Sequence, residues 1–239
     1  LSWSSDNTLR LWDAQTGKAL ATLEGHTDSV TGATPLEGGR LLSWSWDNTL
    51  RLWDTQAGEA LATFEGHTFW VEGATPLEGG RLLSWSMDKT FRLWDAQTGE
   101  ALAILEGHTD TVSGATTLDD GRLLSWSWDN TLRLWDAQTG EDLATLEGIA
   151  DSVRGVTPLE DGRLLSWSED NTLRLWDAPT GEALATLEGH TNDVIGATTL
   201  EGGRLLSWST DNTLRLWDAQ TGEALATLEG HTDSVTGAT

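Results

Sequence analysis

The amino-acid sequence predicts an all-β protein built from four-stranded antiparallel sheets that pack face to face around a common axis. Three observations lead to this prediction. The chain repeats every 41 residues, each period holds short β-compatible segments between turn formers, and no segment shows the 3.6-residue apolar spacing of a helix. One such sheet cannot bury both of its faces, whereas neighbouring copies can cover each other. We therefore expect a single domain over residues 1–239.

The tripeptide Leu-Trp-Asp marks the period. Its tryptophan recurs at an interval of 41 residues, as Trp12, Trp53, Trp94, Trp135, Trp176 and Trp217. Six full periods would exceed the 239-residue chain by seven residues, so residue 1 falls inside a repeat. Because the chain starts with leucine and contains one methionine, we expect it to be a window from a longer multidomain protein.

Each period predicts four strands. In the first complete period they span residues 30–36, 40–46, 49–54 and 59–65. The separators are Glu-Gly-Gly, Asp-Asn and Gln-Ala-Gly, and these residue types form tight turns. Strands of this length joined by such turns form an antiparallel meander. We number the strands of a period first to fourth in chain order.

The two chain ends share one period. Residues 1–13 supply its second and third strands, residues 18–24 its fourth, and residues 235–239 repeat a first strand. Pairing of 235–239 beside residues 1–4 would close the ring and leave no strand edge exposed. Identical edges on identical chains would also pair between molecules, as a homo-oligomer or a larger ring. Both forms of closure stay open.

Three motifs recur in register along the whole chain. They are Gly-His-Thr at 25–27, Trp-Ser-Trp-Asp-Asn-Thr at 44–49 and Leu-Arg-Leu-Trp-Asp at 50–54. With them the chain resembles the WD-repeat β-propeller family, in a highly repetitive, recently amplified form. The resemblance implies a β-propeller of four-stranded blades, six in this chain, with one blade split between the N- and C-termini.

The resemblance also implies a hydrogen-bonded network in each blade. In the blade that begins at residue 30 its members are His26, Asp47, Trp53 and either Ser43 or Ser45. A buried indole N–H and a buried imidazole need partners, so such a network is structural rather than catalytic. The corresponding residues of other blades are His67, Asp88 and Trp94; His108, Asp129 and Trp135; His190, Asp211 and Trp217; and His231, Asp6 and Trp12.

Two columns, meaning positions that are equivalent in all repeats, depart from the family pattern. Ile149 replaces histidine in one repeat, and we expect that blade to lack the network and to fray first under denaturant. The second strands carry tryptophan where the family more often has a small residue. We expect these indoles to fill space between neighbouring sheets, and they would also favour a ring wider than six blades. They are Trp3, Trp44, Trp85, Trp126, Trp167 and Trp208.

Composition narrows the classes of function. The chain has 14 Lys and Arg against 38 Asp and Glu, a net charge of -24, which disfavours nucleic acid and anionic membrane surfaces as partners. No apolar run approaches the roughly 18 residues of a membrane span, and no leader peptide is recognisable. The absence of cysteine removes disulfides and thiolate chemistry. We expect a soluble, cytoplasmic protein.

The sequence predicts no enzyme, metal site or cofactor. No nucleophile, base and orienting group occur together outside the repeated columns. The aspartate-rich turns lack the spacing of a calcium loop, and no glycine-rich phosphate loop leads into a helix.

Three columns vary among otherwise near-identical repeats. The residue before the turn aspartate is Ser5, Trp46, Met87, Trp128, Glu169 or Thr210. The residue before the first-strand valine is Ser29, Trp70, Thr111, Ser152, Asp193 or Ser234. The residue after it is Thr31, Glu72, Ser113, Arg154, Ile195 or Thr236. In a meander all three columns lie at the blade end that carries the second-to-third turn, and we name it the variable end.

Strand alternation places both residues that flank the valine on one side. The resemblance adds that WD-repeat proteins commonly bind partners through this end. Unrestrained drift would touch both ends about equally, yet the opposite end barely changes, and the changes here include large apolar residues that serve as interaction anchors. We predict a partner-binding surface made of Trp46, Phe69, Trp70, Glu72, Met87, Trp128, Arg154, Glu169, Asp193 and Ile195.

The sequence thus predicts a non-catalytic scaffold that recognises a protein or peptide. The alternative is a structural or self-assembling repeat array, natural or engineered, that closes rings by strand pairing between chains. In that case the variation among the repeats would be drift.

Overall fold

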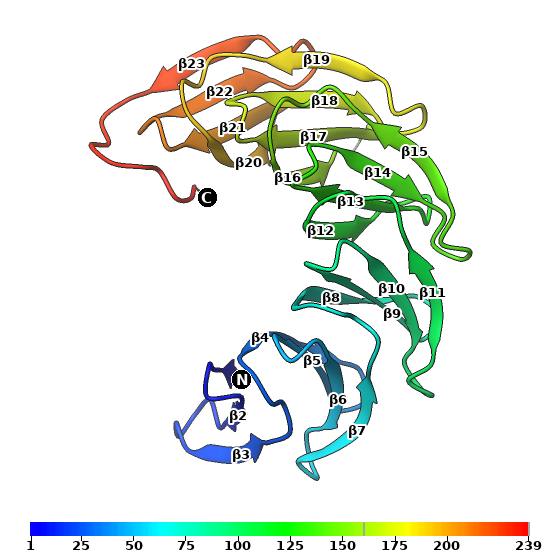
Figure 1. Ribbon diagram of the computed structural model, residues 1–239. Coiled ribbons are helices and arrows are strands. Elements are labelled where there is room, and N and C mark those ends of the chain that lie inside the picture. The colour runs from blue at the N-terminus through cyan, green and yellow to red at the C-terminus, as the bar shows by residue number, and fades with distance from the viewer. Residues whose placement is uncertain (160, 239) are drawn as a thin grey trace. The chain divides into compact units, whose positions relative to one another are not determined.

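A computed structural model describes residues 1–159 and 161–238. This part of the chain contains 23 strands and no helix, so it holds no helix able to cross a membrane. In every sheet the strands follow one another side by side in chain order, as antiparallel meanders (Figure 1). The prediction of an all-β chain of meander sheets is confirmed.

One sheet has three strands and the other five have four. The N-terminal sheet consists of β1 (Ser2–Trp3), β2 (Leu9–Trp12) and β3 (Ala19–Leu23). Blade 1 consists of β4 (Val30–Leu36), β5 (Arg40–Ser45), β6 (Leu50–Asp54) and β7 (Glu59–Phe64). Blade 2 consists of β8 (Val71–Leu77), β9 (Arg81–Ser86), β10 (Phe91–Asp95) and β11 (Ala101–Leu105).

Blade 3 consists of β12 (Val112–Thr117), β13 (Leu123–Ser127), β14 (Leu132–Trp135) and β15 (Asp142–Leu146). Blade 4 consists of β16 (Val153–Pro158), β17 (Arg163–Ser168), β18 (Leu173–Asp177) and β19 (Ala183–Leu187). Blade 5 consists of β20 (Val194–Leu200), β21 (Arg204–Ser209), β22 (Leu214–Asp218) and β23 (Ala224–Leu228). In blade 1 the strand ends expected from the sequence are correct to within one residue.

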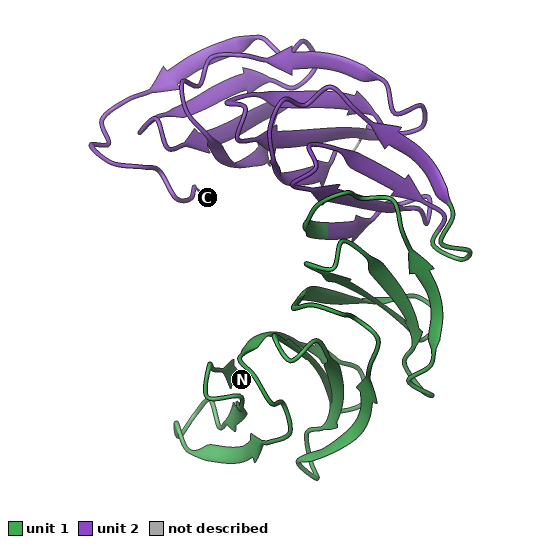
Figure 2. Cartoon of the chain, in the orientation of Figure 1, with its two compact units in different colours: residues 1–114, 137–141 green, residues 115–136, 142–239 purple. Residues whose placement is uncertain are grey.

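The chain divides into two compact units (Figure 2). Unit 1 comprises residues 1–114 and 137–141, and contains the N-terminal sheet with blades 1 and 2. Unit 2 comprises residues 115–136 and 142–239, and contains most of blade 3 with blades 4 and 5. A single domain over the whole chain stays a prediction.

Within a unit, neighbouring blades bury the sides of their sheets that face each other. Alternate leucines of β6 face one way, and Arg51 and Trp53 face the other, because side chains alternate along a strand. The contact between blades 1 and 2 is typical, and its buried members are Leu42, Leu50, Leu52, Phe64, Val71, Ala74, Leu82, Trp94 and Ala96. Full burial of each such leucine contributes about 1.5–3 kcal/mol.

The second-strand tryptophans lie flat against glycines of the adjacent first strand. Trp44 is paired with Gly32, and a Cβ atom on that glycine would meet the Trp44 ring at 2.2 Å. The same close approach occurs between Gly73 and Trp85, Gly155 and Trp167, and Gly196 and Trp208. The indoles of Trp44, Trp126 and Trp167 also pack against the clusters between blades, which confirms the space-filling role for these three, whereas Trp3 of the N-terminal sheet is 45% exposed.

The last described residues occupy the place where a first strand begins. The Val235 amide donates to the Ser209 carbonyl at 3.1 Å, as the Val30 amide does to Ser4 at 3.2 Å. Residues 231–238 form no strand, and residue 239 lies outside the described residues. The completion of the N-terminal sheet by residues 235–239 stays a prediction.

Candidate protein-interaction site

A single serine hydroxyl links the buried indole and imidazole of each complete network. In blade 1, Trp53 Nε1 donates to Ser43 Oγ at 2.8 Å, and Ser43 Oγ lies 2.8 Å from His26 Nε2. The other ring nitrogen, Nδ1, lies 2.8 Å from Asp47 Oδ2. Ser43 is therefore the network serine. Ser45 instead donates to the Asp28 carbonyl at 2.9 Å.

The same geometry recurs in blades 2 and 5, through Ser84 and Ser207. In these blades His67 lies 2.8 Å from Asp88, and His190 lies 2.9 Å from Asp211. In blade 3, Trp135 donates to Ser125 at 2.8 Å, His108 is buried, and Asp129 accepts from Thr131 in its turn.

The N-terminal sheet has the start of this network, because Trp12 Nε1 donates to Ser2 Oγ at 2.8 Å. Asp6 caps its own turn by accepting from Thr8. His231 belongs to the other unit, so its pairing with Asp6 stays a prediction.

Hydrogen bonds keep the aspartates of the networks in blades 1, 2 and 5 ionised. Burial alone would raise the pKa of Asp47, but hydrogen bonds from His26, Thr49 and the Thr27 amide outweigh it and hold the pKa well below its ordinary value. The pKa values of Asp88 and Asp211 are lowered in the same way. In blade 5, burial lowers the pKa of His190 in spite of Asp211. These side chains are enclosed, and the arrangement stabilises the blade.

Blade 4 lacks the network histidine, and the residues around that position make different contacts. Ile149 is buried in the histidine's place, while Trp176 still donates to Ser166 at 2.9 Å. Asp170 accepts from the Ala150 amide at 2.9 Å and lies 3.6 Å from Arg174 Nη2. The guanidinium of Arg174 thus takes the place of the imidazole as a side-chain partner of the Asp170 carboxylate.

Backbone hydrogen bonds join two of the variable columns at one end of blades 1, 2, 4 and 5. The amide before the turn aspartate donates to the carbonyl of the residue before the valine, as Trp46 does to Ser29 and Met87 does to Trp70, both at 3.0 Å. The topology predicted for the variable end is therefore confirmed within these blades.

A β-bulge at the start of the first strands of four blades corrects one step of the sequence reasoning. The register skips one residue between Val71 and Gly73, and likewise in blades 1, 4 and 5. The skipped residue is the variable one after the valine, for example Glu72 or Arg154. Regular strand alternation was therefore the wrong basis for its direction, because a bulge leaves one residue unpaired and redirects its side chain.

An aromatic cluster occupies the variable end between blades 1 and 2. The rings of Trp46 and Trp70 stack with centroids 4.4 Å apart and planes 16° apart. Phe69 lies against Trp70 at 5.2 Å, tilted by 43°. Trp46 and Phe69 are 37% and 46% exposed, and Trp70 is half-buried. Three large rings from two blades thus form one accessible surface, which we call the aromatic cluster.

An ionic cluster occupies the equivalent place between blades 4 and 5. Arg154 Nη2 lies 2.8 Å from Glu169 Oε1 and 3.9 Å from Asp193 Oδ2. All three side chains are partly exposed to solvent. Because its charge is matched by two carboxylates of the same unit, Arg154 differs from the free anchor that the sequence suggested.

The two clusters reveal a pairing that sequence reasoning missed. Each joins the turn residue of one blade to the residue before the valine of the next, 24 positions later: Trp46 with Trp70, and Glu169 with Asp193. This fixed spacing of 24 residues was the feature of the sequence from which the pairing could have been predicted. The other predicted residues stand outside the two clusters: Glu72 and Trp128 are exposed, whereas Met87 and Ile195 are half-buried.

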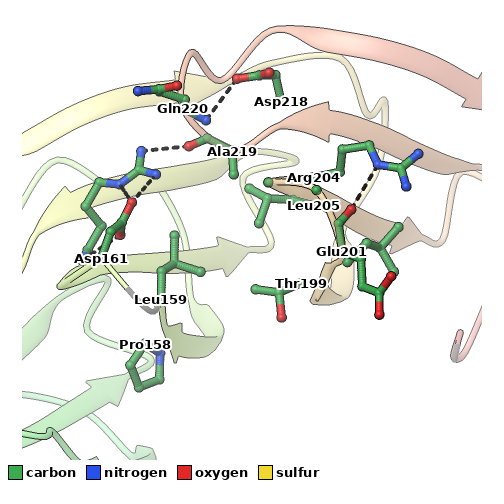
Figure 3. Close-up of a pocket in the computed structure, with 14 residues that line it drawn as sticks. Pro158, Leu159, Asp161, Thr199, Glu201, Arg204, Leu205, Asp218, Ala219 and Gln220 are labelled. Carbon is green, nitrogen blue, oxygen red and sulfur yellow. Dashed lines mark hydrogen bonds and ion pairs between the residues drawn. The ribbon is translucent and has the colours of Figure 1, made fainter.

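A cavity of about 1020 Å³ lies at the opposite end of blades 4 and 5 (Figure 3). Arg163 spans its rim, donating to the Ala219 carbonyl at 2.6 Å and to Asp161 Oδ2 at 2.8 Å. Leu159, Thr199 and other residues of the repeated turns line it. None of the predicted binding residues does so. Among the residues that the structure describes, no three His, Asp or Glu side chains gather as metal ligands.

Comparison with known proteins assigns the family. The model of the WD domain, G-beta repeat family (WD40) matches residues 17–54, 58–95, 99–136, 140–177 and 181–218. The chain belongs to the WD40 family. WD40 propellers are scaffolds that typically mediate protein interactions and are generally non-catalytic. Each matched WD40 segment combines a fourth strand with the first three strands of the next sheet.

A solved structure similar to this WD40 chain is the crystal structure of the computationally designed Ika8 protein. The TM-score is 0.83 at 28% sequence identity, over 98% of this chain and 72% of that one. No curated protein matches the chain.

Proposed function

We propose that this protein is a non-catalytic recognition module, part of a larger multidomain protein, that binds a protein or peptide through its variable end. The aromatic cluster is the observation that carries the proposal. Trp46, Phe69 and Trp70 expose a continuous aromatic surface to water, and such surfaces on soluble proteins mark sites of interaction. Tryptophans in this setting are frequent hot spots of protein interfaces.

The chemistry of the variable end differs from blade to blade. The aromatic cluster lies in unit 1, while the ionic cluster of Arg154, Glu169 and Asp193 lies in unit 2. The repeated frame beneath them is nearly constant in sequence. Side chains that differ on a constant frame support a role in selecting a partner.

Affinity capture with the wild-type chain and a Trp46→Ser/Trp70→Ser double variant tests the proposal. We expect the double variant to lose the captured partner by several kcal/mol, the scale of two hot-spot anchors. The matched control is Leu61→Ser, which also removes an exposed apolar side chain but lies on β7. A Trp128→Ser variant tests the isolated tryptophan of unit 2 separately. Equal capture by the double variant and the wild type would remove the proposed function.

The second candidate function is a self-assembling array, and one observation favours it. Leu228 of blade 5 is 45% exposed, whereas its equivalent in blade 4, Leu187, is 1% exposed. Blade 5 thus presents an apolar sheet face of the kind that the next repeat covers elsewhere, and a sheet of another copy would cover it. Sedimentation equilibrium over a hundredfold range of concentration tests this candidate. A constant monomer mass would exclude it.

A further inference from the structure

We propose that the aromatic cluster receives the cationic side chain of an arginine or lysine in a basic peptide segment of the partner. This inference rests on the proposed function and names the chemistry of the ligand. It is carried by the geometry of the aromatic rings, by a carboxylate two residues from Trp70, and by two arrangements in which the chain already holds its own guanidinium groups.

The rings offer a negative π surface. Trp70 is stacked on Trp46 at 4.4 Å and also lies 5.2 Å from Phe69, so the three rings hold one another in place. The outward parts of Trp46 and Phe69 stay accessible. Indole faces attract cations electrostatically, and a rigid set of rings loses little conformational entropy when a side chain binds.

Glu72 supplies an unmatched negative charge two residues from Trp70 in the sequence. It is the unpaired residue of the β8 bulge. Desolvation of its carboxyl group raises its pKa, although the residue as a whole is exposed, and no ion pair among the described residues includes it. The one basic residue of the nearby β9–β10 turn, Lys89, donates instead to the Thr109 carbonyl at 2.7 Å. A cation from a partner would satisfy this carboxylate.

Two kinds of contact expected for the ligand already occur within the chain: a guanidinium between carboxylates and a guanidinium over an indole ring. At the variable end of blade 4, the bulge residue Arg154 lies between the carboxylates of Glu169 and Asp193. Inside blades 1 and 2, Arg51 and Arg92 lie over the rings of the third-strand tryptophans at 6.0 and 5.9 Å. The fold therefore accommodates guanidinium groups against indoles and between carboxylates.

The charge of the whole chain favours a basic ligand over an acidic or neutral one. A net charge of -24 attracts basic segments over distances of about a Debye length and repels acidic ones. Long-range attraction by itself is unspecific, and the aromatic cluster with Glu72 provides the local contact that selects a site.

Selection from a displayed library of random twelve-residue peptides tests the inference, with the purified 239-residue chain as bait. We expect the selected peptides to be enriched in arginine and lysine. Fluorescence anisotropy then measures the dissociation constants of the labelled peptides. Trp70→Ser should weaken binding about tenfold or more, and Glu72→Gln about threefold at low salt and less at high salt.

The matched control for Glu72→Gln is Glu78→Gln. Glu78 is an exposed glutamate of the same blade, in the β8–β9 turn at the opposite end, and its substitution makes the same change in net charge. We expect it to alter the dissociation constant by less than about twofold, because a distant exposed charge is largely screened. Replacing the basic residue of the peptide with glutamine should weaken binding as much as Trp70→Ser does.

The outcomes separate this inference from the proposed function. Peptides that depend on Trp70 but carry no basic residue would overturn the inference and leave the recognition function standing. Binders that are insensitive to Trp46 and Trp70 would overturn both. Basic peptides weakened equally by Glu72→Gln and Glu78→Gln would show unspecific attraction only, and a selection without binders would also overturn the inference.

Discussion

One serine hydroxyl holds the buried network of blade 1 together. The Ser43 hydroxyl accepts from Trp53 Nε1 and lies 2.8 Å from His26 Nε2, while His26 Nδ1 lies 2.8 Å from Asp47 Oδ2. The lowered pKa of Asp47 keeps its carboxylate ionised. The sequence predicted the residue types but left Ser43 and Ser45 open, because both face the same side of one strand. The choice depends on where the imidazole lies, and that is a tertiary contact.

Acid should destabilise the protein in two steps. Burial lowers the pKa of His190 below its ordinary value of 6.5, so the unfolded chain binds that proton first and stability falls as the pH drops below about 6.5. The lowered pKa values of Asp47, Asp88 and Asp211 add a second loss below about 3.8. Chemical denaturation from pH 8 to pH 3 measures both.

The variant His190→Gln isolates the first step. The difference in unfolding free energy between the wild type and this variant should shrink as the pH falls from 7 to 5, because only the wild type has the imidazole that must stay neutral. A difference that is independent of pH over that range would contradict the assignment.

The residue types of the turns made the strand ends predictable from the sequence. The β-bulges were not predictable in this way. Asn48 at φ 70° and Gly38 at φ 74° adopt the left-handed conformation that tight turns need, so residue type alone marks the strand ends. The bulge between Val71 and Gly73 depends on pairing with β9, and no local residue pattern signals it. The Trp46–Trp70 stack likewise requires two blades.

Blade 4 should open before the other blades of its unit. Ile149 fills the space of the histidine but cannot accept from Ser166 or donate to Asp170, and the remaining Arg174 contact to Asp170 is 3.6 Å long. Hydrogen exchange at low denaturant should show faster exchange in β16–β19 than in β20–β23. The reverse variant Ile149→His should slow it, and equal protection in the wild type would count against this expectation.

The arginine that begins the second strand of a blade links it to the next blade. Arg163 of blade 4 donates to the Ala219 carbonyl of blade 5 at 2.6 Å and pairs with Asp161. We expect Arg163→Met to lower the unfolding free energy by about 1.5–3 kcal/mol, the range for a hydrogen bond that involves a charged group. The control Arg40→Met removes only a bond of 3.2 Å to the Glu37 carbonyl and should cost less. Thermal unfolding compares the two.

At the scale of the whole molecule, repetition made the family predictable from sequence, because five or more motifs in register leave few alternative folds. Closure was not predictable, since the repeat pattern is satisfied equally by a strand from the same chain and by one from another copy. The choice between closure within one chain and closure between copies depends on where one first strand, residues 235–239, pairs.

One glycine tests closure by that strand. Gly237 is the counterpart of Gly32, and it has open space around it in the structure. If residues 235–239 pair beside Trp3, an alanine at 237 meets the indole, and Gly237→Ala should cost about 1–3 kcal/mol, as overpacking does. Gly73→Ala, where the new Cβ would lie 2.1 Å from Trp85, is the positive control. A neutral Gly237→Ala would contradict closure, and sedimentation of the wild type distinguishes closure within one chain from closure between chains.

The contact of indole and glycine also governs how the copies can diverge. At Gly32 and Trp44 neither partner can change alone: a side chain on the glycine collides with the ring, and a smaller residue at 44 leaves a void. Point mutations act on one residue at a time, so these coupled columns stay uniform among the copies. A bulge residue such as Glu72 has no such partner and is free to change singly. Duplication of this repeat therefore yields an unchanging frame with positions on which new specificities can be assembled stepwise.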